Sequence, residues 1–228
     1  MSIISFSHVS KKYPGDVTAL TDVSMEIEES ELVYLAGPSG AGKSTLLKLV
    51  AGIEQPSGGL LLVSGQDMRK LNRTTLPYLR RKLGVILQQH RLLQDRSVLQ
   101  NVMLPLIVSG ASTKEATQRA GVALDRVGLG GKIGLLPQAL SGGEQQRASI
   151  ARAIVHKPRI ILADEPTANL DRASGKLVIE LLQAFNAAGA TCIISTHDER
   201  LLQNADRVVL LERGRVIAMH DAQSEVGA

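Results

Sequence analysis

Apolar and polar residues along this chain of 228 residues follow two periods, one typical of strands and the other typical of helices. Residues 3–9 and 23–27 alternate between the two kinds of side chain, which predicts half-buried antiparallel strands near the N-terminus. Uninterrupted apolar runs predict buried strands instead, and they lie at residues 32–36, 60–63, 83–87, 160–163 and 191–195. A hairpin over residues 208–217 is predicted to close the chain.

Helical periodicity occupies most of the intervals between these strands. Helices are predicted at residues 46–50, 76–82, 98–108, 113–127, 148–155 and 173–187, with Thr113 as an N-cap. No strand pattern occurs between residues 89 and 158, which predicts a helical subdomain inserted into a sheet domain of residues 1–88 and 159–228. The pattern therefore predicts one α/β domain, with a mixed sheet core and an N-terminal antiparallel β subdomain.

A glycine-rich loop joins the strand at residues 32–36 to the next helix, and it matches G-x-x-x-x-G-K-[ST] at every constrained position. Such a loop directs backbone N–H groups and the positive end of the helix dipole into one concavity, which suits an anion. An ordinary glycine-rich turn is the alternative, but it has no use for a lysine and a hydroxyl pair after the last glycine. The predicted phosphate-binding residues are Gly37, Pro38, Ser39, Gly40, Ala41, Gly42, Lys43, Ser44 and Thr45. Lys43 is expected to reach the β- and γ-phosphates, and the Ser44 hydroxyl is expected to ligate Mg²⁺.

Polar residues follow three other buried strands, at the edge of the sheet where ligands of open α/β folds are contacted. Gln88 could orient a water or complete a Mg²⁺ shell, although a surface amide is its simpler interpretation. Asp164 suits the outer shell of Mg²⁺, and Glu165 suits a general base for the attacking water; a solvated acidic turn is the alternative. His197 could donate to a γ-phosphate, or it could be a helix cap or a satisfied loop residue.

A second candidate anion site begins the helix that follows residue 140. Ser141 and Glu144 have the spacing of a capping box, and Asp171 is a predicted N-cap of the helix at 173–187. Gly142 and Gly143 each cost about 1 kcal/mol of helix stability relative to alanine, which suggests that they serve a backbone-lined anion site. Tyr13, in a predicted turn at residues 11–15, could stack on a nucleobase or be a half-buried turn residue.

The composition limits the classes of function. The net charge of +4 suits a nucleic-acid partner or an anionic membrane but does not choose between them, and the basic run at residues 80–82 is best explained as a solvated face. Two percent aromatic residues argue against a base-stacking platform for single strands. Cys192 is the only cysteine, which fits a reducing cytosol. The N-terminus has no basic flank or long apolar core, so no secretory signal is expected. The sequence has no run of about 18 apolar residues, so the chain itself is not expected to span a membrane.

Taken together in chain order, these motifs resemble the nucleotide-binding domain of ABC transporters over essentially the whole chain. The phosphate loop, Gln88, residues 140–147, residues 160–165, Asp171 and His197 match that family's Walker A, Q-loop, signature, Walker B, D-loop and H-loop. The resemblance implies a P-loop NTPase fold of ABC type, with Tyr13 stacking on adenine. It also implies a Mg²⁺-dependent ATPase that works as a head-to-tail homodimer. In that dimer one ATP bridges the phosphate loop of one copy and Ser141 to Glu144 of the other, with Asp171 at the interface.

Within this family, residues 92–98, 101–102, 140–147, 162–166 and 169–171 are similar to those of the FtsE family of cell-division ATPases. That resemblance implies an FtsX-like integral membrane partner that regulates peptidoglycan hydrolases. It also implies a peripheral position on the cytoplasmic face of the inner membrane at the division site. The lipoprotein-releasing LolD family and the macrolide exporters of the MacB family share most motifs and remain an alternative. An ATPase acting on nucleic acid is a weaker alternative, and no direct contact with nucleic acid is expected.

Three residues depart from the usual pattern of the family without removing a catalytic group: Leu87, Gln89 and Ala168. Because Gln89 stands where many relatives have an acidic residue, the sequence does not define the surface that docks the partner.

Overall fold

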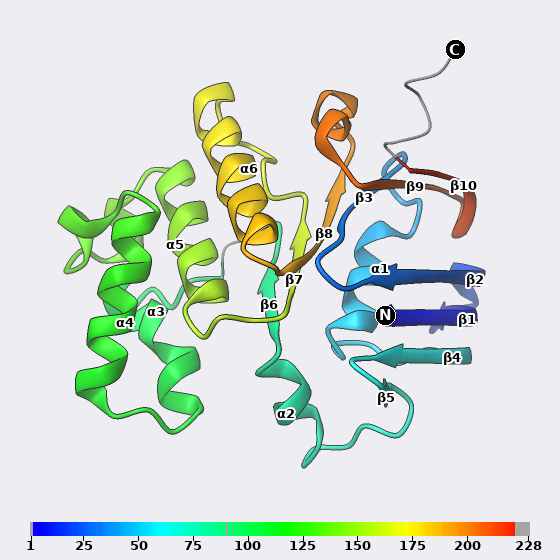
Figure 1. The fold of residues 1–228 in the computed structure, drawn as a ribbon, viewed down its shortest axis with the longest axis horizontal. Helices are drawn as coiled ribbons and strands as arrows, with labels where there is room; N and C mark the ends of the chain where they lie inside the picture. Colours follow the sequence, from blue (N-terminus) through cyan, green and yellow to red (C-terminus); the bar gives the residue numbers. More distant parts are fainter. Residues whose placement is uncertain (1, 90, 222–228) are drawn as a thin grey trace.

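Two sheets and a group of helices make up the protein in the computed structural model, which describes residues 2–89 and 91–221 (Figure 1). Residues 1, 90 and 222–228, which the predicted domain bounds include, lie outside the described residues. The architecture is α/β with one mixed and one antiparallel sheet, so the predicted fold class is confirmed.

The antiparallel sheet has the strand order β2-β1-β4-β5. It consists of β1 (Ser2–Tyr13), β2 (Val17–Glu28), β4 (Gly58–Val63) and the short β5 (Gln66–Asp67). The turn predicted at residues 11–15 is wrong in its first half, because Tyr13 is a strand residue that pairs with Val17. Lys11 does not break the strand, since its buried ammonium donates to the Glu54 carboxylate at 2.7 Å.

The mixed sheet has the order β10-β9-β3-β8-β7-β6 and places the ends of three motif-bearing strands side by side. Its strands are β3 (Leu32–Ala36), β6 (Leu83–Ile86), β7 (Ile160–Asp164), β8 (Thr191–Thr196), β9 (Arg207–Glu212) and β10 (Arg215–Asp221). All neighbouring pairs are parallel except β9 with β10. The carboxyl ends of β3, β8 and β7 therefore meet at one edge, and residues that follow these strands converge there.

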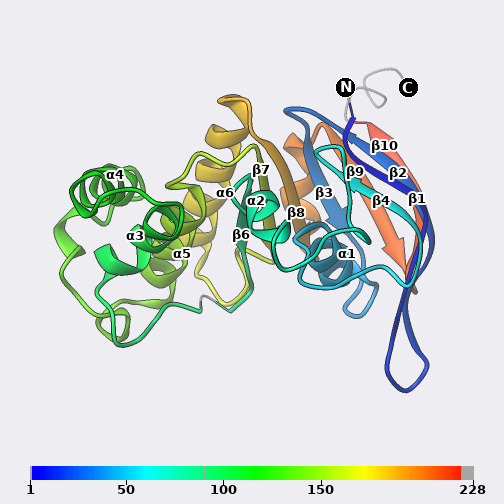
Figure 2. The ribbon, with the colours of Figure 1, turned by 90° about the horizontal axis from the view of Figure 1, so that it is seen from below.

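Helices cover this sheet and also form a separate lobe (Figures 1 and 2). The helices near the sheet are α1 (Lys43–Val50), α2 (Leu76–Arg80), α6 (Arg172–Ala187) and the 3₁₀ helix η3 (Glu199–Asn204). The lobe contains α3 (Val98–Val108), α4 (Thr113–Arg126) and α5 (Gly142–Ile154), with η1 (Gly130–Lys132) and η2 (Pro137–Ala139) between α4 and α5. Figure 2 shows α3 and α4 on the far side of the mixed sheet from the antiparallel sheet.

Three apolar clusters hold these layers together. The first fills the space between the antiparallel sheet, α1 and one face of the mixed sheet, and it includes Leu35, Leu46 and Leu61. The second lies on the opposite face beneath α5 and α6, and the third is the core of the helical lobe. Because α5 contributes Ile150 to the second cluster and Ala148 to the third, it ties the lobe to the sheet.

One helix cap differs from prediction and another is confirmed. Ser112, and not Thr113, is the N-cap of α4, because its hydroxyl accepts a hydrogen bond from the Glu115 N–H at 3.2 Å. The predicted capping box of Ser141 and Glu144 is confirmed, and it stabilises the first turn of α5 from Gly142 despite both glycines.

Candidate functional site

The glycine-rich loop between β3 and α1 folds around the ammonium group of Lys43. This group donates to the carbonyl oxygens of Gly37 at 2.7 Å and Pro38 at 3.0 Å, and the side chain is 5% exposed. Gly42, the N-cap of α1, has a φ of 108° and no side chain to satisfy the first N–H groups of the helix. The first turn also carries no acidic residue, so nothing there repels an anion. The loop thus presents backbone donors and one buried cation.

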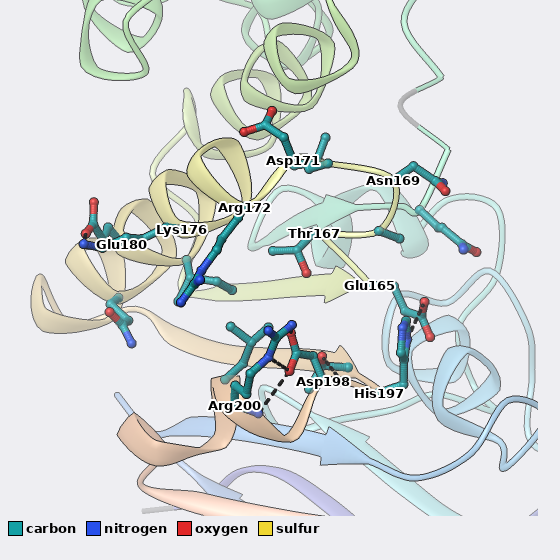
Figure 3. Close-up of a pocket in the computed structure, with 18 residues that line it drawn as sticks. Glu165, Thr167, Asn169, Asp171, Arg172, Lys176, Glu180, His197, Asp198 and Arg200 are labelled. Carbon is teal, nitrogen blue, oxygen red and sulfur yellow. Dashed lines mark hydrogen bonds and ion pairs between the residues drawn. The ribbon is translucent and has the colours of Figure 1, made fainter.

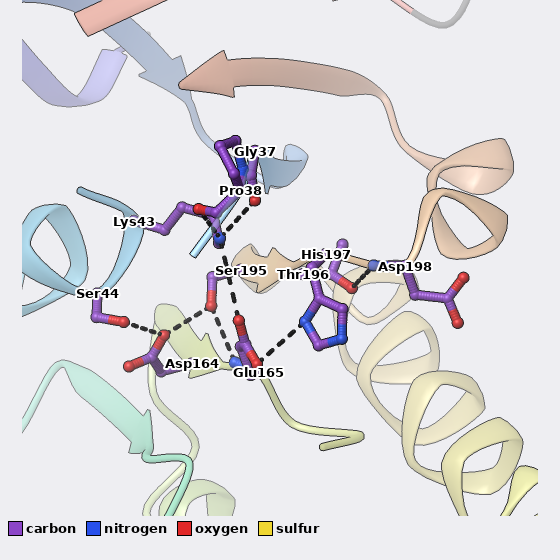
Figure 4. A network of polar contacts seen from close by, with 10 residues as sticks. All are labelled: Gly37, Pro38, Lys43, Ser44, Asp164, Glu165, Ser195, Thr196, His197 and Asp198. Atoms are coloured by element: carbon purple, nitrogen blue, oxygen red, sulfur yellow. Dashed lines mark hydrogen bonds and ion pairs between the residues drawn. The ribbon is translucent and has the colours of Figure 1, made fainter. Parts of the chain in front are cut away.

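Beside this loop, Asp164 ends β7 and joins the loop to the sheet. Its Oδ1 accepts hydrogen bonds from the Ser44 hydroxyl at 2.9 Å and the Ser195 hydroxyl at 2.7 Å (Figure 4). No group of three His, Cys, Asp or Glu residues that could hold a metal occurs in the described ranges. Mg²⁺ does not require such a cage, because one or two carboxylates plus substrate phosphates usually bind it. A hydroxyl and a carboxylate at 2.9 Å fit that requirement.

Glu165 directs its carboxylate between a lysine and a histidine. The distance from Oε1 to Lys43 Nζ is 4.0 Å, and the distance from Oε2 to His197 Nδ1 is 3.2 Å (Figure 4). Glu165 is 20% exposed and His197 is 66% exposed, so the pair faces solvent while Lys43 does not. The structure therefore brings Lys43, Ser44, Asp164, Glu165 and His197 together.

A hollow of about 790 Å³ opens beside Glu165 and His197 (Figure 3). Gln88, exposed two residues after the end of β6, lines this hollow together with Asn169 and Asp171. Gln88 lies on the rim and takes no part in the contact between Ser44 and Asp164. Figure 3 shows side chains of α6, including Arg172 and Lys176, at the far end of the hollow from His197. The space beside the carboxylate and imidazole is thus open to another molecule.

The predicted second anion site lies at the start of α5. The Ser141 hydroxyl accepts from the Glu144 N–H at 3.3 Å, and the Ser141 N–H donates to Glu144 Oε2 at 3.0 Å. The Lys132 ammonium also donates to Glu144 Oε1, and this bond, with that from Ser141, lowers the pKa of the Glu144 carboxyl. Gly142 is exposed, whereas Gly143 packs against the Ser174 side chain of α6.

Asp171 is the N-cap of α6, as its position before the helix predicts. Its carboxylate accepts from the backbone N–H groups of Ala173 and Ser174 at 3.0 Å and from the Ser174 hydroxyl at 2.7 Å. The Ser174 hydrogen bonds lower the pKa of the Asp171 carboxyl. Asp171 is exposed on the rim of the hollow, where a partner could reach it.

The phosphate loop, the signature residues and Tyr13 lie in three different parts of one chain. Figures 1 and 2 both show the start of α5, with its signature residues, in a different part of the molecule from α1. Tyr13 lies on β1, half-buried, with the Lys11 ammonium 4.9 Å from its ring centroid, and it is not part of the Lys43 network. The phosphate loop and Ser141 to Glu144 therefore do not form one pocket in a single copy.

Sequence reasoning missed two polar residues that contact the site. The sequence pattern assigns Ser195 to a buried strand and Lys132 to a loop, with no role for either side chain. A serine that directly follows the apolar pair Ile193 and Ile194, near the carboxyl end of a buried parallel strand, was the available signal for Ser195. Nothing near Lys132 in the sequence distinguishes it from other loop lysines.

The strand, glycine-rich loop, helix and acidic strand end define a P-loop domain of the ABC class, and comparison with known proteins supports this assignment. A family model described as ABC transporter matches residues 20–168, and the chain belongs to this family. The chain is an ABC-type ATPase.

Among curated relatives, the cell division ATP-binding protein FtsE of Escherichia coli (strain K12) is 47% identical over 94% of this chain and 97% of its own length. FtsE of Haemophilus influenzae is 48% identical over 93% of this chain and 98% of its own. The macrolide export ATP-binding/permease protein MacB of Rhodospirillum rubrum is 41% identical over 100% of this chain but only 35% of its own. Several FtsE proteins thus match at full length, which supports an ABC ATPase subunit of the cell-division machinery.

A solved structure shows the same fold in a dimer. The ATP-binding cassette MJ0796, described as dimeric in a post-hydrolysis state bound to ADP and Pi, is 34% identical to this chain. It aligns with a TM-score of 0.90 over 96% of this chain and 98% of its own. None of the helices in the described ranges is long and apolar enough to cross a membrane.

Proposed function

We propose that two copies of this chain bind two ATP molecules with Mg²⁺ at their interface and hydrolyse them, and that this cycle drives a membrane partner in cell division. The observation that carries the proposal is the convergence of Lys43, Ser44, Asp164, Glu165 and His197 at one sheet edge. Phosphoryl transfer depends on positioning and charge stabilisation, and these side chains supply both.

The phosphates of ATP would replace the carbonyl partners of Lys43. In the free chain the Lys43 ammonium is held by Gly37 and Pro38 of the loop itself, so it is already directed into the concavity. Pro38, Ser39 and Gly40 are exposed and open to the ligand. Mg²⁺, when bound, would neutralise phosphate charge; the Ser44 hydroxyl would ligate it, Asp164 would lie in its outer shell and Gln88 would complete its shell.

Glu165 would act as the general base. It would accept a proton from a water whose oxygen forms a bond to the γ-phosphorus, while the bond from that phosphorus to the β,γ-bridging oxygen breaks. The products are ADP and inorganic phosphate. His197, 3.2 Å from Glu165, would orient the carboxylate and donate to the γ-phosphate.

The second copy would supply the remaining contacts. Ser141, Gly142, Gly143 and Glu144 form a helix start that lies away from the phosphate loop of its own chain, and the solved relative MJ0796 is a dimer. We infer that the signature of one copy completes the phosphate site of the other, with Asp171 at the interface and Tyr13 against the adenine. Residues 89–158 would act as the lobe that carries the signature, inserted into a core of residues 1–88 and 159–228.

Exchange of Glu165 for glutamine tests the mechanism. The Glu165→Gln variant should keep its affinity for ATP, since the amide retains the shape of the carboxylate, but its kcat should fall at least about 100-fold because the base is lost. It should also accumulate as an ATP-bound dimer in size-exclusion chromatography. Glu115→Gln, on the exposed surface of α4, is the matched control and should leave turnover unchanged. Undiminished hydrolysis by Glu165→Gln would exclude Glu165 as the base.

The proposed partner is an integral membrane protein of the FtsX family, which would hold this chain at the cytoplasmic face of the inner membrane at the division site. The full-length match to FtsE proteins supports this partner over an exporter subunit, because MacB carries the matching segment within a much longer chain.

Deletion of the gene should give filaments at low osmolarity, and an FtsX-like protein should copurify with this chain from membranes. Retained lipoproteins or lost macrolide resistance would favour the exporter alternative instead. DNA that binds the chain and stimulates hydrolysis in a salt-sensitive way would revive a nucleic-acid function.

A further inference from the structure

Ser195 occupies a central place in the mixed sheet although its side chain is polar. It lies on β8 between Leu35 of β3 and Asp164 of β7 in the strand register, and it is fully buried. A buried hydroxyl without partners destabilises a fold, so the hydrogen bonds of Ser195 explain why a polar residue is tolerated at this position. They connect the two acidic residues of the site.

The direction of both hydrogen bonds follows from the chemistry of the partners. The Glu165 backbone N–H can only donate, and it reaches the Ser195 hydroxyl oxygen at 2.9 Å. The Asp164 carboxylate accepts, and its Oδ1 lies 2.7 Å from the same hydroxyl. The single hydrogen of Ser195 therefore points to Asp164, while a lone pair receives Glu165 (Figure 4).

Glu165 requires such support because its backbone is strained. Its φ is 45°, in the left-handed region that a residue with a Cβ seldom adopts. This conformation turns the Glu165 carboxylate toward Lys43 and His197. The Glu165 N–H is held by both the carbonyl oxygen of Ser195, at 3.2 Å, and its hydroxyl.

We propose that Ser195 is a positioning residue for hydrolysis: its hydroxyl fixes the Asp164 carboxylate and the backbone of Glu165 relative to each other. This inference rests on the proposed roles of Asp164 in Mg²⁺ binding and of Glu165 as the base. Without the hydroxyl, Asp164 keeps its bond from Ser44 and Glu165 keeps its bond to the Ser195 carbonyl, so the fold survives. The mutual alignment of the two acids is what would be lost.

Three variants of the full-length chain test the proposal. Ser195→Ala removes the hydroxyl, and Ser195→Thr restores it on a β-branched residue that suits a central strand. Thr191→Val removes a different buried hydroxyl at the opposite end of β8, where the Thr191 hydroxyl accepts from the Ser30 N–H at 2.9 Å. Each is assayed for steady-state hydrolysis, Mg²⁺ dependence, thermal unfolding and binding of a non-hydrolysable ATP analogue.

Ser195→Ala should lower kcat about tenfold, which is the effect of about 1.4 kcal/mol on the barrier, while the analogue binds within about twofold of the original affinity. The Mg²⁺ concentration for half-maximal activity should rise. Ser195→Thr should recover most of the kcat. Thr191→Val should lose thermal stability without loss of kcat, because it is remote from the acids.

The outcomes separate this proposal from the proposed function. Normal kcat and Mg²⁺ dependence in Ser195→Ala would overturn the positioning role, and so would equal losses of kcat in Ser195→Ala and Thr191→Val. If Ser195→Ala does not fold, Ser195→Cys gives the same comparison, because it fills the volume with a weakly hydrogen-bonding group. A normal rate in Ser195→Ala while Glu165→Gln is inactive refutes only the positioning role. A normal rate in Glu165→Gln refutes the base itself.

Discussion

At the scale of single residues, the phosphate loop depends on positions where the backbone conformation or the surrounding space excludes a Cβ atom. Gly37 has a φ of 141°, and a Cβ added there would lie 2.1 Å from the carbonyl oxygen of Leu211 on β9. Gly40 also has a positive φ, of 79°, but nothing lies within 4 Å of an added Cβ. Both positions of the motif therefore require glycine, but for different physical reasons: Gly37 for space and backbone conformation, Gly40 for backbone conformation alone.

This difference predicts unequal costs for the same substitution. Gly40→Ala should lower the free energy of unfolding by about 1–2 kcal/mol, which is the cost of a left-handed residue with a Cβ. Gly37→Ala should cost more, about 3 kcal/mol or above, because the loop must also move away from the backbone of β9. Urea unfolding without nucleotide measures both values. Equal losses would show that the contact between Gly37 and Leu211 is easily relieved.

At the scale of elements, the start of α5 shows how a helix can carry two glycines and still begin cleanly. Ser141 and Glu144 satisfy each other's backbone N–H groups, and Lys132 from η1 holds the other oxygen of the Glu144 carboxylate. The negative charge that the capping box brings to the predicted anion site is thus paired within the chain. Lys132 links the loop before α5 to the helix itself.

The lowered pKa of Glu144 makes this pairing dependent on pH. Its first cause is the Lys132 hydrogen bond, and the pKa falls below the ordinary value of 4.5. A depressed pKa stabilises the fold above the unfolded-state value and loses this contribution as pH falls through the folded value. The stabilisation by Lys132 should therefore be constant above the unfolded-state pKa of Glu144 and be lost as the pH falls through the lower folded-state pKa.

Lys132→Met tests this expectation. At neutral pH it should lower the free energy of unfolding by at most about 1 kcal/mol, because the pair is partly exposed and water screens it. It should also move the Glu144 pKa up toward its ordinary value, as followed by NMR of the carboxyl carbon. Lys114→Met on the exposed surface of α4 is the control. A stability difference that persists unchanged after NMR shows the Glu144 carboxyl to be protonated would contradict the role of its charge.

The elements also show what the sequence could predict. Buried strands such as β3 and β7 were predictable because unbroken apolar runs leave few alternatives, and the capping residues Ser141 and Asp171 were predictable from local chemistry. The strand at Tyr13 was not, because its pairing with Val17 overrides the turn signal of the following residues. The convergence of Lys43, Asp164, Glu165 and His197 followed from parallel strands ending together. The role of Ser195 did not, since it depends on hydrogen bonds between neighbouring strands.

At the scale of the whole molecule, the two predicted anion sites lie on different parts of the chain, one on the mixed sheet and one at the start of α5. The phosphate loop lies on the mixed sheet, whereas the signature begins α5, which joins the helical lobe to that sheet (Figures 1 and 2). The hollow beside Glu165 and His197 lies open between α6 and η3. In the proposed dimer, the start of α5 from a second copy would complete the phosphate site that the phosphate loop of one copy begins.

Gly142 allows this dependence on a second copy to be tested without disturbing the fold. Nothing lies within 4 Å of a Cβ added at Gly142, and its φ is not in the left-handed region, so Gly142→Leu should fold and even gain up to about 1 kcal/mol of helix stability. The exposed leucine would instead fill the space that the partner's phosphate needs. Affinity for a non-hydrolysable ATP analogue should stay unchanged in the monomer. Turnover should fall at least about 100-fold, since both interfacial sites lose their second half.

The Gly142→Leu, Glu165→Gln double variant separates loss of assembly from loss of chemistry. Glu165→Gln alone should elute as a dimer with ATP, and the double variant should elute as a monomer under the same conditions. Gly121→Leu is the matched control, because Gly121 also lies within a helix, α4, and also has open space around an added Cβ. It should leave both dimerisation and turnover intact. Full turnover by monomeric Gly142→Leu would mean that one copy hydrolyses ATP unaided, and the requirement for a second signature would then be wrong.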